Sequence, residues 1–329
     1  MMKAAFVCEN AQMIHRVYGE AQKAALFRRV EMSPGVFRSL QDDALRDVDV
    51  IFSTWGMPAC TEQEIRQWTP NLKMVFYAAG TVQSFARPFL HEHVRVFSAW
   101  RANAVPVAQY TFAQIILALK GYFAVQPLTR TCRSKAQAVF QHYPGCFDVK
   151  VGLLGCGAIG SLVAEMLGRL DVEVLVFDPF LSEEKAKALG VRKAEMAEIF
   201  ATCNVVSNHL ANLPETVGII RREYFLSMPS YSVFINTGRG PQLREKDVYD
   251  MLTADNTRFA LLDVMTEEQN SDANPLNALP NCLITPHIAG SSGLEVRRMA
   301  EYAIAALDCV LDGRPCEHEV TEAMLKTMA

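Results

Sequence analysis

The sequence lacks a CxxC pair, a strong excess of one charge sign and an uninterrupted apolar run near the roughly 18 residues of a membrane helix. Its nine cysteines are odd in number and scattered along the chain, which favours reduced thiols over a disulfide framework. The first ten residues hold one lysine and an apolar run too short for a secretory signal. We therefore expect a cytoplasmic protein with no membrane partner.

Charge and histidine placement exclude two further classes of function. Lysine and arginine number 32 against 36 acidic residues, so the net charge of −4 predicts no basic face for nucleic acid. The histidines show no metal-ligand spacing, and we expect no metal site. Function must therefore come from a specific site rather than from bulk charge.

Length and pattern predict an α/β protein with two domains. A chain of 329 residues exceeds the size at which one hydrophobic core usually stops growing. In the first part we expect strands over 4–8, 49–55, 72–79 and 94–99. Helices are expected over 14–30 and after Thr61, where Glu64 completes a capping box.

Residues 103–120 predict one helix that is apolar almost all round, with Pro106 in its first turn. Such a helix must be buried on several sides. We interpret it as the crossing into the second domain and, as a hypothesis, as part of a homodimer interface. A helix packed between the two domains is the open alternative.

The second part alternates strands and helices from residue 150 onward. Strands are expected over 151–154, 173–177, 205–208, 232–236, 259–264 and 282–285, which makes a doubly wound sheet of about six strands. A long helix over 294–311 follows, and the last residues should return to the first domain. The predicted fold class is thus α/β, with two Rossmann-like doubly wound parallel-sheet domains and a cleft between them.

A glycine pattern, GCGAIG over 155–160, follows the first strand of this second part. Alone a GxGxxG pattern is weak evidence, but here it also opens a helix. Gly155 would permit a tight turn, Gly157 would let a pyrophosphate approach the backbone, and Gly160 would let the helix pack closely. With Ala158 and Ile159 these glycines form the candidate phosphate site, at a helix N-terminus that offers free N–H groups.

Asp178 ends the next strand, 18 residues after Gly160. A carboxylate there would accept hydrogen bonds from the adenosine ribose and repel a 2′-phosphate, which predicts NAD rather than NADP. The alternative is a turn residue before Pro179. His209, past a later strand, is a weaker candidate for lining the cofactor site.

Three reactive side chains follow three other strands: Arg239, Glu268 and His287. Hydride transfer to a ketone leaves an alkoxide, and histidine is suited to protonate it. A planar guanidinium can hold the carboxylate of a 2-oxo acid with two hydrogen bonds, and a carboxylate beside the imidazole fixes the orientation of the ring. The trio predicts interconversion of a 2-oxo and a 2-hydroxy acid, although each residue alone could be an ordinary loop residue.

The segments GCGAIG, VFDP, INTGRG, LLDVMTEE and TPHIAG together resemble the D-isomer-specific 2-hydroxyacid dehydrogenases, in the order and spacing of that family. The resemblance implies that Arg239 binds the substrate carboxylate, that His287 is the acid/base and that Glu268 pairs with it. It also implies substrate contacts at the backbone of Ala79, Gly80 and Thr81. The full set of candidate cofactor contacts is Gly155, Gly157, Ala158, Ile159, Gly160, Asp178, Thr237, Gly238 and Asp263, the last near the nicotinamide.

The resemblance further implies a substrate domain of residues 1–102 plus 299–329 and an NAD-binding domain of residues 103–298. Three departures from the family stand outside the trio. Gln269 replaces a proline, Gln109-Tyr110 replaces Glu-His, and Asn212-Leu213 replaces Leu-Thr.

Two alternatives stay open. An NAD-sensing binding protein similar to the family's co-repressors would keep the same trio. Formate dehydrogenase pairs its histidine with glutamine, so Glu268 argues against it.

Three aromatic residues follow or end strands of the first domain: Trp55, Tyr77 and Trp100. We expect them to face the substrate, which predicts an uncharged substrate end larger than a methyl group. A place in the domain core is the alternative for each ring.

Overall fold

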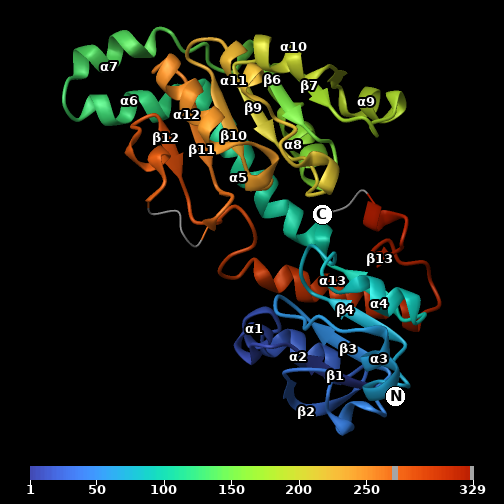
Figure 1. The fold of residues 1–329 in the computed structure, drawn as a ribbon. Coiled ribbons are helices and arrows are strands. Elements are labelled where there is room, and N and C mark those ends of the chain that lie inside the picture. Colours follow the sequence, from blue (N-terminus) through green and yellow to red (C-terminus); the bar gives the residue numbers. More distant parts are fainter. Residues whose placement is uncertain (269–272, 327–329) are drawn as a thin grey trace. The chain divides into compact units, whose positions relative to one another are not determined.

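The structure, a computed structural model, describes residues 1–268 and 273–326 (Figure 1). The chain forms two compact units. The first comprises Met1–Ala104 and Ser291–Ala329, and the second comprises Val105–Gly290.

The first unit is built on a sheet with the strand order β13-β5-β4-β3-β1-β2. All pairs are parallel except β13 with β5, and the order β2-β1-β3-β4-β5 is that of a doubly wound fold. Its strands are β1 (Lys3–Val7), β2 (Glu31–Phe37), β3 (Val50–Ser53), β4 (Met74–Tyr77), β5 (Arg95–Ser98) and β13 (Glu319–Val320). Its helices are α1 (Ala11–Val17), α2 (Glu20–Phe27), α3 (Glu62–Trp68), α4 (Ala86–His91) and α13 (Val296–Leu311).

A row of phenylalanines crosses four strands of this sheet. Phe6, Phe52, Phe76 and Phe97 are register partners on β1, β3, β4 and β5. The Phe76 ring stacks on Phe52 at 5.3 Å and on Phe97 at 4.6 Å between centroids. All four rings are buried, so this row forms the centre of the first core.

The expected helix over 14–30 is wrong, because α1 ends at Val17 and α2 begins at Glu20. Gly19 between them packs against Arg297 of α13, where a Cβ would lie 2.2 Å from the guanidinium. The edge strand β2 and the helix α4 were also missed. The capping box of Thr61 and Glu64 is present at the start of α3.

The second unit holds a wholly parallel sheet with the order β12-β11-β10-β9-β6-β7-β8. Its strands are β6 (Phe147–Leu154), β7 (Asp171–Phe177), β8 (Arg192–Lys193), β9 (Val205–Asn208), β10 (Val233–Asn236), β11 (Phe259–Leu262) and β12 (Cys282–Ile284). Its helices are α6 (Tyr122–Thr129), α7 (Arg133–Phe140), α8 (Ala158–Leu167), α9 (Glu183–Leu189), α10 (Met196–Thr202), α11 (Arg222–Ser227) and α12 (Glu245–Ala254). The short β8 adds a seventh strand to the six expected, and α6 and α7 were not predicted.

Both faces of this sheet are apolar and covered by helices, as a buried parallel sheet requires. Val174 and Val176 belong to the core cluster that includes α8, whereas Leu175 between them belongs to the cluster with α10, α11 and α12. The predicted fold class, two doubly wound parallel-sheet units, is confirmed, with the antiparallel β13 as the departure.

The long apolar helix α5 (Trp100–Leu119) joins the two units in sequence. It begins three residues earlier than expected, so Pro106 is its seventh residue and lies inside the helix rather than in its first turn. By length and composition α5 could also cross a membrane, contrary to the expectation that no such stretch exists. One such helix is weak evidence, because half of its apolar window is buried and core helices of soluble proteins pass the same test.

Phe76→Ala should lower the free energy of unfolding of the first unit by about 3–5 kcal/mol, because it opens a cavity within the stacked row. Trp55, Trp68 and Trp100 are the three tryptophans of the chain, and all lie in this unit. Urea unfolding followed by tryptophan fluorescence therefore reports the change. Phe27→Ala is the control, since Phe27 is 51% exposed and its loss should cost about 0.5 kcal/mol. Equal losses in both variants would contradict the central role of the row.

Candidate active site

The glycine loop lies between β6 and α8, beside the end of β9, where the strand order of the sheet reverses. Gly155 has φ +92°, and a Cβ there would lie 2.7 Å from the carbonyl oxygen of His209. At Gly160 a Cβ would lie 2.1 Å from the carbonyl oxygen of Gly155. At Gly157 a Cβ would meet nothing within 4 Å, so this backbone is open to a ligand. A close-packed loop with one open glycine at a helix N-terminus fits a dinucleotide pyrophosphate.

Asp178 connects the end of β7 to this loop. One carboxylate oxygen accepts a hydrogen bond from the Cys156 amide at 2.7 Å, and the other accepts from the Phe180 amide at 2.8 Å. The contact with Phe180 forms the turn that was the alternative role for Asp178. The contact with Cys156 holds the glycine loop. Ala158 and Ile159 begin α8, whose first amides point out of the helix end.

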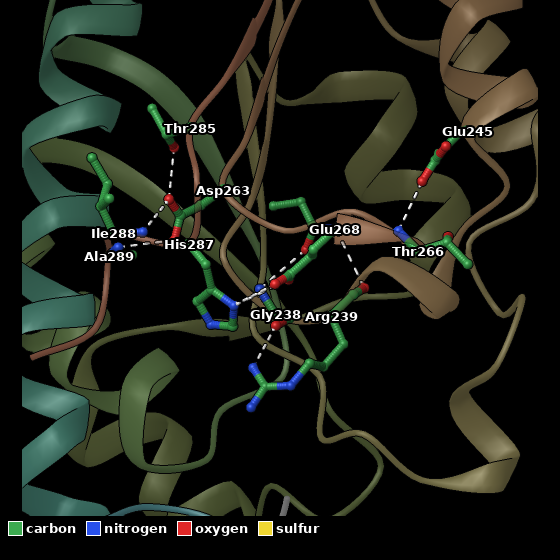
Figure 2. Close-up of polar contacts among 11 residues, drawn as sticks. Gly238, Arg239, Glu245, Asp263, Thr266, Glu268, Thr285, His287, Ile288 and Ala289 are labelled. Atoms are coloured by element: carbon green, nitrogen blue, oxygen red, sulfur yellow. Dashed lines mark hydrogen bonds and ion pairs between the residues drawn. The ribbon is translucent and has the colours of Figure 1, made fainter. Parts of the chain in front are cut away.

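His287 and Glu268 come together at the carboxyl end of the sheet (Figure 2). The imidazole Nδ1 lies 3.0 and 3.2 Å from the two carboxylate oxygens of Glu268. Both side chains are close to half exposed, so the ring is held by Glu268 and still accessible. This bond fixes one ring nitrogen and leaves Nε2 as the atom able to exchange a proton with a ligand.

The backbone of His287 is held in an unusual conformation, with φ +55°. Its amide donates to the carbonyl oxygens of Asp263 and Thr285. The buried carboxylate of Asp263 accepts from Thr285 Oγ1 at 2.6 Å and from the amides of Ile288 and Ala289 at 2.8 and 2.9 Å. Asp263 therefore clamps the loop that presents His287, and its predicted place near a nicotinamide stays a prediction.

Arg239 follows β10 and lies near this pair (Figure 2). Its Nη1 donates to the carbonyl oxygen of Gly238 at 2.7 Å. Burial lowers the pKa of Arg239, and the negative charge of Glu268 opposes that shift. A guanidinium keeps its proton in proteins, so Arg239 is a cation. A cation, a carboxylate and an imidazole therefore lie at the same end of the sheet.

The neighbouring His209 is buried against two hydroxyl groups. Its Nε2 lies 3.0 Å from Ser207 Oγ, and its Nδ1 lies 3.5 Å from Thr237 Oγ1, which in turn contacts Thr111 of α5. Burial lowers its pKa to about 3, so the ring is neutral near pH 7. Thr237 and Gly238 are both buried directly after β10, and their contact with a cofactor stays a prediction.

Three further residues at this end of the sheet were not predicted from the sequence. The Tyr110 hydroxyl, at a position that departs from the family, lies 3.3 Å from Thr285 Oγ1. Asn208 and Gln242 form a buried amide network under Arg239. Asn208 leaves one signal in the sequence, a polar residue ending an apolar strand. Gln269 lies outside the described residues.

The expected substrate loop belongs to the first unit and follows β4. Ala79 is buried, Gly80 is half-buried and Thr81 is exposed. Ser98 Oγ donates to the carbonyl oxygens of Ala79 and Gly80, at 3.1 and 2.6 Å, and so holds the backbone of this loop. The contact of this loop with a substrate stays a prediction.

The three aromatics of the first unit divide between core and partial exposure. Tyr77 is 6% exposed and packs on Phe85 at 4.8 Å, so its expected place facing a substrate is wrong and the core alternative holds. Trp55 and Trp100 are half-buried. Among the residues that the structure describes, no group of three histidines, cysteines or carboxylates could hold a metal ion.

Comparison with known families identifies the second unit. Residues 113–289 match the family described as "D-isomer specific 2-hydroxyacid dehydrogenase, NAD binding domain". D-3-phosphoglycerate dehydrogenase of Archaeoglobus fulgidus is 35% identical over 141 residues, 43% of this chain and 27% of that protein. Hydroxypyruvate reductase of Blautia hydrogenotrophica is 31% identical over 169 residues, 50% of this chain and 51% of that protein. The aligned part thus spans about half or less of these relatives.

Solved structures share the fold over nearly the whole chain. The NAD complex of a D-isomer specific 2-hydroxyacid dehydrogenase from Lactobacillus delbrueckii ssp. bulgaricus has a TM-score of 0.78 at 17% identity, covering 97% of this chain and 100% of that one. D-2-hydroxyisocaproate dehydrogenase has a TM-score of 0.75 at 17% identity, with the same coverage. At these identities the likeness shows the fold. The matched NAD binding domain assigns NAD as the cofactor of the second unit.

Gly157→Ala should weaken NADH binding by about tenfold or more while leaving the unfolding midpoint unchanged, because its Cβ occupies only the open side of the loop. Gly155→Ala is the matched comparison. Its positive φ and its contact with His209 predict a less stable protein before any cofactor is added. NADH fluorescence titration and thermal unfolding measure the two effects. An unchanged NADH affinity in Gly157→Ala would remove this loop from the cofactor site.

The buried His209 should make the stability of the second unit sensitive to acid. Its folded pKa of about 3 lies below the value of about 6.5 for a free imidazole, so between these values the unfolded chain binds more protons. Stability is therefore fully present above pH 6.5 and falls toward pH 3, with a slope of up to about 1.4 kcal/mol per pH unit. His209→Gln should reduce this slope.

The measurement is the opening free energy of the β9 and β10 peptides in hydrogen exchange, corrected for intrinsic rates, from pH 8 to pH 4.5. Wild type and variant should run parallel between pH 7 and 8, which serves as the internal control. Parallel curves down to pH 4.5 would show that His209 does not carry the acid sensitivity.

Proposed function

Because the chain belongs to the D-isomer specific 2-hydroxyacid dehydrogenase family, we propose that it reduces a 2-oxo acid to a D-2-hydroxy acid with NADH. The hydrogen bond between His287 and Glu268, at the same sheet end as Arg239 and the glycine loop, carries this proposal. An acid, a carboxylate-binding cation and a dinucleotide cradle are the three parts that the reaction needs.

The trio divides the work around the substrate carbonyl. When bound, the reduced nicotinamide supplies a hydride to the carbonyl carbon. The Arg239 guanidinium holds the substrate carboxylate through two parallel hydrogen bonds and thereby orients the carbonyl. His287 gives a proton from Nε2 to the developing alkoxide, while Glu268 orients the ring through its hydrogen bond to Nδ1.

Cofactor contacts follow from the loops of the second unit. We propose that the pyrophosphate binds at Gly157, Ala158 and Ile159, and that Asp178 accepts from the adenosine ribose. The same carboxylate would repel a 2′-phosphate. Thr237, Gly238 and Asp263 would then face the nicotinamide half of the cofactor.

The first unit is proposed as the substrate domain, with the backbone of Ala79, Gly80 and Thr81 contacting the substrate carboxylate. The second unit is the proposed NAD-binding domain. Trp55 and Trp100 stay candidates for the substrate's far end, which we propose is uncharged and larger than a methyl group.

A homodimer is the proposed assembly, with helices α5, α6 and α7 in its interface. Leu117, Tyr122 and Phe140 are 38%, 48% and 45% exposed and line a surface hollow of about 450 Å³. Partly exposed apolar side chains grouped in this way fit a second copy of the chain. Sedimentation velocity that gives a monomer mass would exclude it.

A panel of 2-oxo acids with NADH tests the function. Turnover is measured as the loss of absorbance of the reduced cofactor. We expect turnover with at least one acid, and a kcat lower by about two to four orders of magnitude in His287→Ala, because a positioned proton donor is lost. Among pyruvate, glyoxylate, phenylpyruvate and 3-phosphohydroxypyruvate, phenylpyruvate should be preferred.

NADH affinity is the control and should change little in His287→Ala. Near-normal turnover in that variant would remove His287 from the mechanism. NADH binding without turnover of any acid would instead favour the sensing, co-repressor-like alternative. A clear preference for the phosphorylated acid or for glyoxylate would overturn the proposed substrate end.

A further inference from the structure

Three side-chain amides are buried at the carboxyl ends of β9 and β10: Asn208, Asn236 and Gln242. All three have no exposed surface. The Asn208 amide nitrogen donates to Gln242 Oε1 at 2.7 Å and to Asn236 Oδ1 at 3.0 Å. Buried amides are costly unless their donors and acceptors are satisfied, so this cluster has a demanding structural role.

The cluster bonds directly to the backbone around Arg239. Gln242 Oε1 accepts from the Arg239 amide at 3.1 Å, and Asn236 Oδ1 accepts from the Gly238 amide at 3.1 Å. Asn236 also donates to the carbonyl oxygen of Arg239 at 3.4 Å. The two peptide groups that carry the Arg239 side chain are thus held by side-chain amides.

Space under this turn is filled by the same amides. A Cβ at Gly238 would lie 2.8 Å from both Asn208 Nδ2 and Gln242 Oε1. The turn is also closely packed at Gly240, where a Cβ would lie 2.2 Å from the backbone of Met265. The turn has little freedom to shift while these amides and the backbone of Met265 stay in place.

Gln242 also reaches the segment after β9. Its Nε2 donates to the carbonyl oxygens of Leu210 and Ala211 at 2.8 and 2.9 Å. Asn208 Oδ1 accepts from the Leu210 amide at 3.2 Å. The amides therefore join the Arg239 turn to the loop whose first residue, His209, packs against Gly155.

We propose that Asn208 and Gln242 are positioning residues for substrate binding, which act by setting the place of the Arg239 guanidinium. This inference rests on the proposed function of Arg239. The guanidinium's hydrogen bond in the structure is to Gly238 of the same turn, so its position depends on the turn itself. Neither Asn208 nor Gln242 lies in the motif segments on which the family resemblance rests.

Gln242→Leu tests the inference, because leucine has a similar size and forms no hydrogen bonds. The KM for the best 2-oxo acid and the Kd for oxamate, measured in the presence of NADH, should rise by about tenfold to a hundredfold, since a displaced guanidinium loses its two-point grip. The Kd for NADH should rise by a clearly smaller factor than the Kd for oxamate, because Gln242 bonds directly to the Arg239 amide and reaches the glycine loop only through the segment after β9. A role in stability alone would move neither ligand constant.

Asn281→Leu is the matched control. Asn281 is buried in the same unit before β12, and its amide donates to the carbonyl oxygens of Leu252 and Arg258. This variant loses comparable hydrogen bonds at the other end of the sheet and should keep oxamate affinity. Equal oxamate losses in Gln242→Leu and Asn281→Leu would overturn the inference.

A double-mutant cycle with Arg239→Met separates this inference from the proposed function. If Gln242 acts through Arg239, the effect of Gln242→Leu on kcat/KM should disappear in the Arg239→Met background. Unchanged oxamate affinity in Arg239→Met would overturn the role of Arg239 itself. A loss in Arg239→Met with no loss in Gln242→Leu would overturn only the positioning role. If Gln242→Leu does not fold, Asn208→Leu decides the question with the same expected result.

Discussion

The register of the parallel sheet in the second unit determines where every proposed cofactor and catalytic residue lies. Hydrogen-bonded pairing places Phe177, Leu154, Asn208, Asn236, Leu262 and Ile284 in one row across six strands. Each proposed cofactor or catalytic residue follows this row by a few positions. A shift of one residue in any strand would turn its side chains to the opposite face and displace its loop. The position of the site therefore depends first on the register of the strands and second on the sequence of the loops.

Two loops beyond this row, those of His287 and Arg239, are held by buried hydrogen-bond acceptors. Asp263 accepts three hydrogen bonds from the loop of His287, and the amides of Asn236 and Gln242 hold the loop of Arg239. Hydrogen bonds in a poorly solvated environment are strong, and an unpaired partner there is costly. This arrangement stabilises the positions of the proposed acid, His287, and the proposed carboxylate-binding cation, Arg239.

The sequence predicted those features that depend on local pattern. The glycine loop, the strand ends and the capping box at Thr61 follow from short segments whose physics is local. The break at Gly19 depends on Arg297, and a contact between residues so far apart leaves no periodic signal. The strand β2 was missed because Pro34 and Gly35 interrupt its alternation. The pairing of Asn208 with Gln242 was missed because it arises only when two strand ends meet.

The distribution of indole rings has a spectroscopic consequence. The first unit holds every tryptophan of the chain, and the second unit holds the NAD binding domain. Indole emission overlaps the absorption of reduced nicotinamide, so energy transfer between them depends on how far apart the two units are. The native protein thus carries the energy-transfer donor, tryptophan, in the first unit and acquires the acceptor, NADH, in the second unit. Energy transfer from tryptophan to bound NADH can then be recorded on the native protein without any attached dye.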